Sequence, residues 1–461
     1  MFTKIEPMSR KCIICSDNDD VLPIYQLSKT FIFYENMLEQ CVTLYSYCKR
    51  CKWSFYPNSY SHDVTRKHCV QRQQVMNTNT FHFGGECVYS HRIFLSFSSA
   101  LLAMRASYHG FVKHYNSIVL NKTAFREKRL DEKNFQINWI VYTVLKLLFL
   151  WSDKDIVVIP YSLYDKEEVN AFFDRHKDEL YRAFVKHWSD HAAHKSPNCT
   201  TGCTDIMIVD GHQKTARITC IFNNCYDNTI EELGPVLVGC PKSVSKHSKT
   251  DSNGLCEKHI KVVDSIGNSA MRFDPLYDVT DEDCNVKRNE LLDNKNRSAT
   301  YGFLISFYSC GIVAGFDESI RSESPRRVLR HFIRIGKISK LPSGIMYDNA
   351  CSIKLYMMAR YGTDYFKSTP ISDHLYHNVH FVIECFHEQN QTRHMCKNEM
   401  RASHPSHMSM FDQINSQIAE QTFSIIAQYK MHWSNYSYPK SYINFILFFH
   451  LYNCDASKTL F

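Results

Sequence analysis

The spacing of hydrophobic and polar residues changes twice along this chain. Up to about residue 88 the apolar residues come in short β-type runs rich in aromatic side chains, such as LPIYQLSKTFIFY and QCVTLYSYC, a pattern typical of half-buried strands. From 89 to 195 they recur mainly at helical spacing. From 196 to 461 short β-type runs return and are followed by helices. The pattern therefore predicts three parts: 1–88, 89–195 and 196–461.

Two segments of the middle part predict buried helices. In YDKEEVNAFFDRHKDELYRAFVKHW the apolar residues recur at helical spacing between charged ones, so we expect them to be core residues rather than a base-stacking surface. These residues are Phe172, Phe173, Leu180, Phe184 and Trp188. The most apolar segment, FQINWIVYTVLKLLFLW, is interrupted by Lys146 and falls short of the ~20 apolar residues of a membrane span. We expect a buried helix there and no membrane association.

The third part predicts an α/β arrangement. IMIVD and ARITCIF, joined by GHQKT, are expected to form a β-hairpin, and TYGFLISFY and GIVAGFD further strands. PRRVLRHFIRIGK is expected to be a helix, GIMYD a strand leading into the helix ACSIKLYMMARY, and SQIAEQTFSIIAQYKMHW and KSYINFILFFHLYN late helices. This order of elements is that of an RNase H-like α/β fold.

Three acidic residues in this part are candidates for one metal site. Asp210 and Asp348 each close an apolar run, and Glu420 lies within a helical pattern. An acid at the end of a strand lies at the edge of a sheet, where a cation and a substrate can reach it. Two strand-end aspartates and a helical glutamate are the ligand set of enzymes that hold two Mg²⁺ or Mn²⁺ ions about 3.5–4 Å apart for phosphoryl transfer. Spacing alone is a weak signal among 47 acidic residues, and the strand-end context strengthens it.

The chain has 19 cysteines, and its first residues, MFTKIEPMSRKC, contain no apolar segment typical of a secretory signal. We therefore expect reduced, intracellular thiols, and we interpret paired cysteines as metal ligands before disulfides. Two Cys-x-x-Cys pairs in the first part predict a zinc-ribbon-like site for Zn²⁺; the alternative is four buried free thiols. The pairs are Cys12 with Cys15 and Cys48 with Cys51.

A second zinc site is predicted in an insertion between the first two acids, at about 220–300. Five residues are available: Cys203, Cys220, Cys240, Cys256 and His259. A closed site needs four ligands, and we favour the last four, with Cys203 and Cys199 as possible substitutes. If the predicted hairpin forms, Cys203 and Cys220 meet at one of its ends. The alternative is that these cysteines are buried singly.

The charge and the remaining histidines carry weaker signals. The excess of 54 Lys and Arg over 47 Asp and Glu gives a net charge of +7, which allows a polyanionic partner without requiring one. Lys214 and Arg217 could contact phosphates of a scissile DNA strand, although surface charges near a turn would have the same pattern. A metal role for the group His374, His377, His380 and Cys385 is a further alternative to ordinary packing.

These motifs together resemble the KDZ (Kyakuja, Dileera and Zisupton) superfamily of DDE transposases. YCKRCKWSFYPNSY with FLSFSSALLAMRASYHGFVKHYN resembles the cysteine-cluster domain that accompanies these transposases. CTTGCTDIMIVDGHQKTARITC, ELGPVLVGC, LCEKH, TYGFLISFYSCGIVAGFDES, MYDNAC, AEQTFSIIAQYK and INFILFFHLYNCD resemble the blocks of the catalytic domain. The chain departs from the family where Tyr376 replaces a common histidine and Ala419 a common cysteine.

The resemblance implies a specific activity. Asp210, Asp348 and Glu420 would be the catalytic triad of a nuclear transposase that cuts DNA at element ends and joins the freed 3′-hydroxyl to target DNA, commonly as a homo-oligomer. Two alternatives remain open. One is a host-recruited, catalytically silent DNA-binding or chromatin protein that keeps the fold, and the other is a nuclease or RNase H-type hydrolase with the same metal chemistry.

Overall fold

The computed structural model forms two compact units. It describes residues 3–15, 21–191, 193–200, 202–212, 216–222, 225–245, 254–266, 299–388, 391, 393–412, 414–429 and 434–459. Unit 1 comprises Met1–Ala183 with Ile443–Leu451 and Phe461, and unit 2 comprises Phe184–Tyr442 with Tyr452–Leu460. The first unit includes residues on both sides of position 88, because strand β9 of the middle part pairs with β6 in the N-terminal sheet. The middle part is otherwise mainly helical, as predicted.

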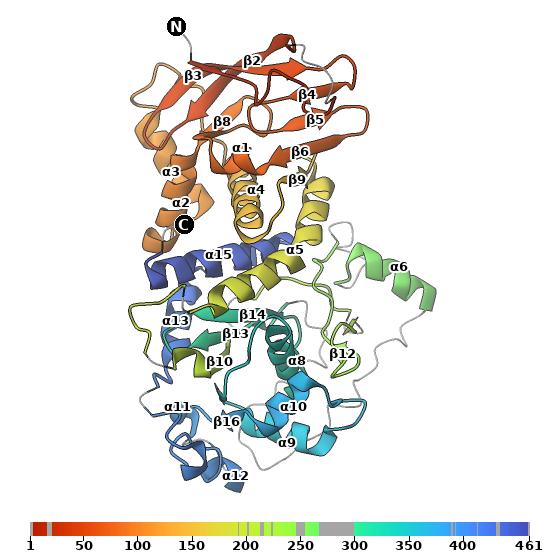
Figure 1. Ribbon diagram of the computed structural model, residues 1–461, viewed down its shortest axis with the longest axis vertical. Helices are drawn as coiled ribbons and strands as arrows, with labels where there is room; N and C mark the ends of the chain where they lie inside the picture. Colours follow the sequence, from red (N-terminus) through yellow and green to blue (C-terminus); the bar gives the residue numbers. More distant parts are fainter. Residues whose placement is uncertain are drawn as a thin grey trace. The chain divides into compact units, whose positions relative to one another are not determined.

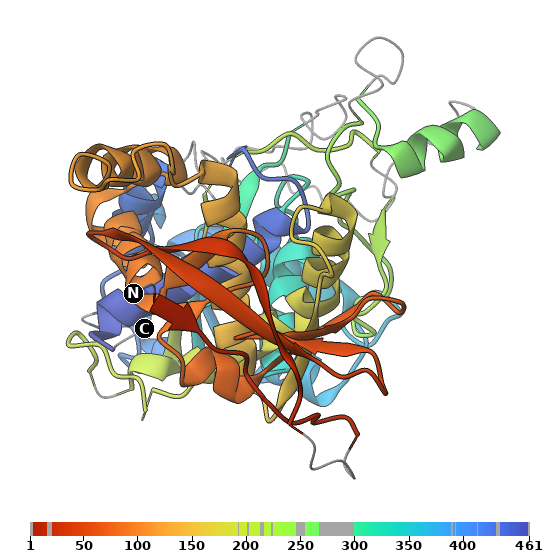
Figure 2. The ribbon, with the colours of Figure 1, turned by 90° about the horizontal axis from the view of Figure 1, so that it is seen from above.

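Unit 1 is built on a nine-stranded sheet with the order β7-β8-β2-β3-β4-β5-β6-β9, in which β1 also pairs with β3. The two long strands β2 and β3 pair antiparallel and run side by side (Figure 2). The strands are β1 Thr3–Ile5, β2 Ile24–Phe33, β3 Leu38–Tyr47, β4 Trp53–Phe55, β5 Tyr60–His62, β6 Lys67–Gln71, β7 Thr80–Phe81, β8 Cys87–Ser90 and β9 Ile156–Ile159.

Helices pack beside this sheet (Figure 1). They are α1 Arg72–Met76, α2 His91–Met104, α3 Tyr108–Val119 and α4 Glu132–Trp151. The residues of α5 Lys166–Ser189 and α15 Lys440–Ser457 are divided between the two units. Ser90, Ser107 and Asp131 cap α2, α3 and α4 by accepting a hydrogen bond from a backbone N–H of the first turn. These caps explain why the helices begin where they do.

The predicted core helices are confirmed. α4 covers the most apolar segment of the chain and buries eleven of its side chains. Among the described residues, no helix combines the length and the apolarity that a membrane crossing requires. The five apolar residues predicted to recur along α5 are each at most 2% exposed: Phe172, Phe173, Leu180, Phe184 and Trp188.

Unit 2 is built on a five-stranded sheet with the order β14-β13-β10-β15-β16. β10 pairs antiparallel with β13 and parallel with β15, and β15 pairs parallel with β16. The strands are β10 Ile206–His212, β13 Gly302–Tyr308, β14 Val313–Ser319, β15 Gly344–Tyr347 and β16 His380–Val382, with a separate pair of β11 Tyr226–Asp227 and β12 Val236–Leu237.

The hairpin predicted between 206–210 and 216–222 is wrong. β10 instead takes β13 as its antiparallel partner, and the described part of 216–222 contributes only an isolated bridge between Ile218 and Ala299. β13 is almost entirely buried and apolar, so it offers β10 a more extensive core contact than a segment containing Arg217 and Thr219.

Helices and short turns complete unit 2. They are α6 Glu257–Ile266, α8 Pro325–Gly336, α9 Ala350–Arg360, α10 Pro370–His377, α11 Cys385–Glu388, α12 His394–Lys397 and α13 Ile418–Ile426, with 3₁₀ turns at Cys203–Asp205, Pro405–His407 and Ala427–Tyr429. α13 packs against β10, where the rings of Phe423 and His212 lie 4.7 Å apart. α6 lies at the margin of the unit in both ribbon views (Figures 1 and 2).

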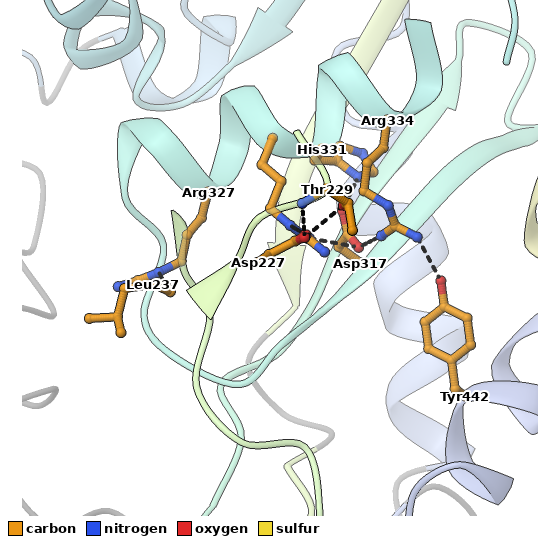
Figure 3. A network of polar contacts seen from close by, with 9 residues as sticks. Asp227, Thr229, Leu237, Asp317, Arg327, His331, Arg334 and Tyr442 are labelled. Atoms are coloured by element: carbon orange, nitrogen blue, oxygen red, sulfur yellow. Dashed lines mark hydrogen bonds and ion pairs between the residues drawn. The ribbon is translucent and has the colours of Figure 1, made fainter. Parts of the chain in front are cut away.

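The basic residues of α8 are used inside the protein. Asp317 of β14 forms ion pairs with Arg330 and Arg334 and accepts a hydrogen bond from His331 (Figure 3). Arg330 also forms an ion pair with Asp227 of β11. Arg327 donates to the Leu237 carbonyl of β12. α8 is thereby tied to both strands of the β11–β12 pair and to the sheet.

Candidate functional site

Acidic residues lie in one row across three neighbouring parallel strands of unit 2. The row is set at the strand starts by the pairing of Ile206 with Gly344 and of Gly344 with His380. Asp210, Asp348 and Glu384 each follow four residues later, near the carboxyl end of β10 and just beyond those of β15 and β16. Neighbouring strands lie about 4.8 Å apart. The structure therefore brings the two predicted aspartates side by side and adds Glu384 as a third acid in the row.

A fourth carboxylate, that of Glu323, approaches the row from the segment after β14. The Tyr347 hydroxyl donates a 2.8 Å hydrogen bond to Glu323 Oε2. Glu323 also lies so close to Gly211 that a Cβ at this position would overlap its carboxylate. Gly211, the residue after Asp210, therefore provides the space that Glu323 occupies beside the row.

Glu420 belongs to a second group at the same site. It lies in the first turn of α13. One carboxylate oxygen of Glu420, one of Glu384 and one ring nitrogen of His387 all lie within 4.8 Å of one another, a group that could hold a metal ion. His387 Nδ1 is 3.0 Å from Glu384 Oε2. Glu384 thus links the strand-end row to the helical glutamate that the sequence predicted.

The electrostatics of the site favour a bound cation. Burial raises the pKa of Asp210 well above its usual value, and the nearby charges of Asp348 and Glu323 raise it further. Burial and the Asp348 charge raise the pKa of Glu323 to about 7. Burial likewise raises the pKa values of Asp348 and Glu420, with the Glu384 carboxylate adding to both. A divalent cation would relieve this mutual repulsion.

The two predicted DNA-contacting residues have different outcomes. Lys214 lies outside the described residues. Arg217 is 2% exposed, and its guanidinium forms a two-pronged ion pair with Glu318, with Nε–Oε1 and Nη2–Oε2 distances of 2.5 and 2.8 Å. A DNA contact would require Arg217 to leave this buried pair, so we do not include it in the functional interpretation.

The predicted N-terminal thiol cluster forms in unit 1. Cys12, Cys15, Cys48 and Cys51 hold their four sulfur atoms within 4.8 Å of one another, in an arrangement that could hold a metal ion. Burial alone would raise the pKa of Cys48, but hydrogen bonds from the Cys51 backbone N–H, from the thiols of Cys51 and Cys12 and from the Arg50 backbone N–H lower it to about 7. A lowered pKa favours the thiolate, which is the form that binds zinc.

The favoured ligand set of the insertion also forms a cluster. Cys220, Cys240, Cys256 and His259 are all buried and bring their ligand atoms within 4.8 Å of one another. Cys220 Sγ and Cys256 Sγ lie 3.4 and 3.3 Å from His259 Nδ1. Cys225, which the sequence interpretation did not consider, lies 3.7 Å from the other ring nitrogen of His259. The cluster is compatible with zinc.

Cys203 is not part of this group, which corrects its assignment to the insertion site. Because the predicted hairpin does not form, Cys203 does not meet Cys220 and instead lies with His191, Cys199 and Cys310. Among the described residues, the group His374, His377 and His380 does not form a metal cluster. The side chain of Cys385 lies outside the described part of the structure.

Sequence reasoning missed three of the acidic site's residues. Glu384 follows the apolar run HFVI, the same signal that identified Asp210 and Asp348, but the metal-site interpretation of this segment included only its histidines and Cys385. Glu323 and His387 carry no such signal, because each reaches the site through a turn or a short helix rather than by its strand position.

Comparisons of the chain with protein-family models, with curated proteins and with solved structures found no match in any of the three. The functional interpretation therefore rests on the chain's own residues and their geometry.

Proposed function

We propose that this chain is a DDE-type DNA transposase, or a descendant of one, that cuts and joins DNA strands with divalent metal ions. The observation that carries the proposal is the row of strand-end acids, Asp210, Asp348 and Glu384, with the helical Glu420 beside Glu384. The strand order β14-β13-β10-β15-β16 is the order expected of an RNase H-like core and supports assigning that fold to unit 2.

The residues present fit a hard divalent cation. Three carboxylate oxygens at the site are buried and have no hydrogen-bond partner in the described part of the chain: Asp348 Oδ1, Glu384 Oε1 and Glu420 Oε2. Buried, unpaired carboxylate oxygens are costly, and oxygen ligands are those that Mg²⁺ and Mn²⁺ prefer. When bound, the ions would neutralise the charge that develops on a phosphate during attack and orient the attacking oxygen.

Each residue then has a definite role. Asp210, Asp348, Glu420 and Glu384 would hold the ions, with Glu384 oriented by its contact with His387. Glu323 is fixed by Tyr347, and with a pKa of about 7 in the metal-free protein it can hold or release a proton near neutral pH.

The transposase interpretation is narrower than metal-dependent phosphoryl transfer. It is supported by the resemblance of DGHQK, YDNAC and EQTFS to KDZ motifs in the same order. Two thiol clusters compatible with zinc also support it, one before Asp210 in the sequence and one between Asp210 and Asp348. It implies DNA ends and target DNA as partners, a nuclear location and action as a homo-oligomer.

The test is a strand-transfer assay with the full-length protein. The proposal predicts inverted terminal repeats on both sides of the gene, and DNA carrying such repeats is the substrate, offered with a target plasmid and Mg²⁺ or Mn²⁺. We expect nicking at the repeat ends and joined products. Asp210→Asn, Asp348→Asn and Glu420→Gln should each lower the rate by about 10²-fold or more, because each removes a metal ligand while keeping side-chain volume.

Asp364→Asn is the matched control, because Asp364 is an exposed acid of the same unit, and its rate should equal that of the parent protein. DNA binding without nicking would contradict the enzymatic proposal and favour a recruited DNA-binding protein. Preferential cleavage of an RNA–DNA hybrid would favour an RNase H-type hydrolase instead.

A further inference from the structure

One group of metal-binding side chains in unit 2 lies apart from the acidic site and was not predicted as a unit. His191 follows α5, Cys199 and Cys203 lie between α5 and β10, and Cys310 lies in the turn between β13 and β14. The imidazole nitrogen and the three sulfur atoms all lie within 4.8 Å of one another. Segments separated by more than one hundred residues thus converge on one point.

The distances around His191 fit a tetrahedral ion. Its Nε2 is 3.1 Å from Cys310 Sγ and 3.6 Å from Cys203 Sγ. Zinc bonds of about 2.3 Å to sulfur and 2.0–2.1 Å to nitrogen, at tetrahedral angles, separate such ligand atoms by about 3.5 Å. The four side chains therefore need only small adjustments to bind one ion.

Tight turns lie beside two of the three cysteines. Gly202, with φ of +75°, precedes Cys203, and Gly311, with φ of +89°, follows Cys310. Both values lie in the left-handed region that favours glycine. The Gly311 N–H also closes the β13–β14 turn by donating to the Tyr308 carbonyl at 2.9 Å. Each turn brings its cysteine toward the centre of the group.

Surrounding donors and packing support the same arrangement. The Ser196 backbone N–H donates to Cys199 Sγ at 3.1 Å, and the Ser309 hydroxyl donates to Cys203 Sγ at 3.4 Å. Hydrogen bonds of this kind stabilise and orient thiolate ligands. Cys203 and Cys310 are only 5% and 4% exposed. The described cysteines are all free, so no disulfide accounts for the convergence.

We propose that His191, Cys199, Cys203 and Cys310 bind one structural zinc ion, separate from the two zinc clusters that the sequence predicted. Three cysteines and one histidine are a closed ligand set of structural zinc. The ion would fasten the segment after α5 to the β13–β14 turn. Because Cys203 lies three residues before β10, it would also anchor the start of the strand that carries Asp210.

The zinc content of the full-length protein tests this site independently of any DNA activity. The protein is purified under reducing conditions, and its zinc is measured by mass spectrometry. With all three thiol-containing clusters loaded, the parent protein should hold three zinc ions per chain. Cys310→Ser and Cys203→Ser should each hold two. Cys454→Ser, which replaces a buried cysteine of the same unit outside the cluster, should still hold three.

A second measurement covers variants that fail to fold. In the native parent protein, Cys199, Cys203 and Cys310 should resist alkylation and become reactive together when a chelator removes zinc. Unchanged zinc content in folded Cys310→Ser and Cys203→Ser, or alkylation of these three cysteines that does not depend on zinc, would overturn the proposal. Loss of strand transfer with three zinc ions retained would instead count against the proposed function alone.

Discussion

At the residue scale, a substitution of Gly211 tests whether the position of the Glu323 carboxylate matters for the reaction. Gly211 is not among the glycines with a positive φ. Its role is therefore to leave space rather than to permit an unusual backbone conformation. An alanine would displace the Glu323 carboxylate, because its Cβ would overlap a carboxylate oxygen. We expect Gly211→Ala to lower strand-transfer activity by about 10²-fold, the effect of misplacing a catalytic group by about 1 Å.

The control for this substitution is Gly110→Ala in α3, where the nearest atom lies 3.3 Å from the added Cβ. It should leave activity unchanged. Full activity of Gly211→Ala would mean that the position of Glu323 does not matter for the reaction.

His68 gives a prediction for pH. Its side chain is buried in unit 1, with Nε2 2.8 Å from the Ser59 hydroxyl, and burial lowers its pKa from 6.5 to about 4. The folded state therefore binds fewer protons than the unfolded state between these values, so stability is lost as the pH falls through this window. We expect the contribution of His68 to the free energy of unfolding to fall by about 2 kcal/mol when the pH is lowered from 7 to 5.

Denaturant unfolding of the full-length protein and of His68→Gln at both pH values measures this effect. The variant should lose less stability on acidification, because a glutamine cannot take up the proton. An identical loss in the two proteins would show that His68 does not contribute.

At the element scale, α8 is held to the sheet and to the β11–β12 pair by its cations. Asp317 is the shared anion, buried between Arg330, Arg334 and His331 (Figure 3). Asp317→Asn should lower the free energy of unfolding by about 3 kcal/mol, because removing one partner leaves buried charge uncompensated. Asp364→Asn should change it by less than about 0.5 kcal/mol. Equal effects of the two substitutions in denaturant unfolding would contradict this role.

A comparison of the predicted with the observed strands shows which features of the fold could be predicted from the sequence. Apolar runs that end in an acid correctly predicted strands carrying Asp210 and Asp348 at their ends, because burial and strand ends are local properties of the sequence. The partner of β10 is not local: β13 begins some ninety residues after β10 ends, and no nearby pattern distinguishes it from the segment at 216–222. The wrong partner for β10 also led to the wrong assignment of Cys203 to the zinc site of the insertion.

At the scale of the whole molecule, the thiol cluster of Cys12, Cys15, Cys48 and Cys51 and the acidic site belong to different compact units. We therefore expect Cys48→Ser to lose one zinc ion and to destabilise unit 1 while unit 2 keeps its affinity for Mn²⁺. Cys41→Ser, a buried cysteine outside the cluster, should keep all its zinc. Metal analysis with Mn²⁺ titration checks both, and loss of Mn²⁺ binding in Cys48→Ser would show that the units are not independent.

The central claim is that the acids of β10, β15 and β16, with Glu420, form one divalent-metal site. Its most direct test is a calorimetric titration of the zinc-loaded full-length protein with Mn²⁺. We predict saturable binding of two ions per chain, lost or weakened at least tenfold in Asp348→Asn and in Glu384→Gln but not in Asp364→Asn. Absence of Mn²⁺ binding by the parent protein, or equal binding by all four proteins, would contradict the account.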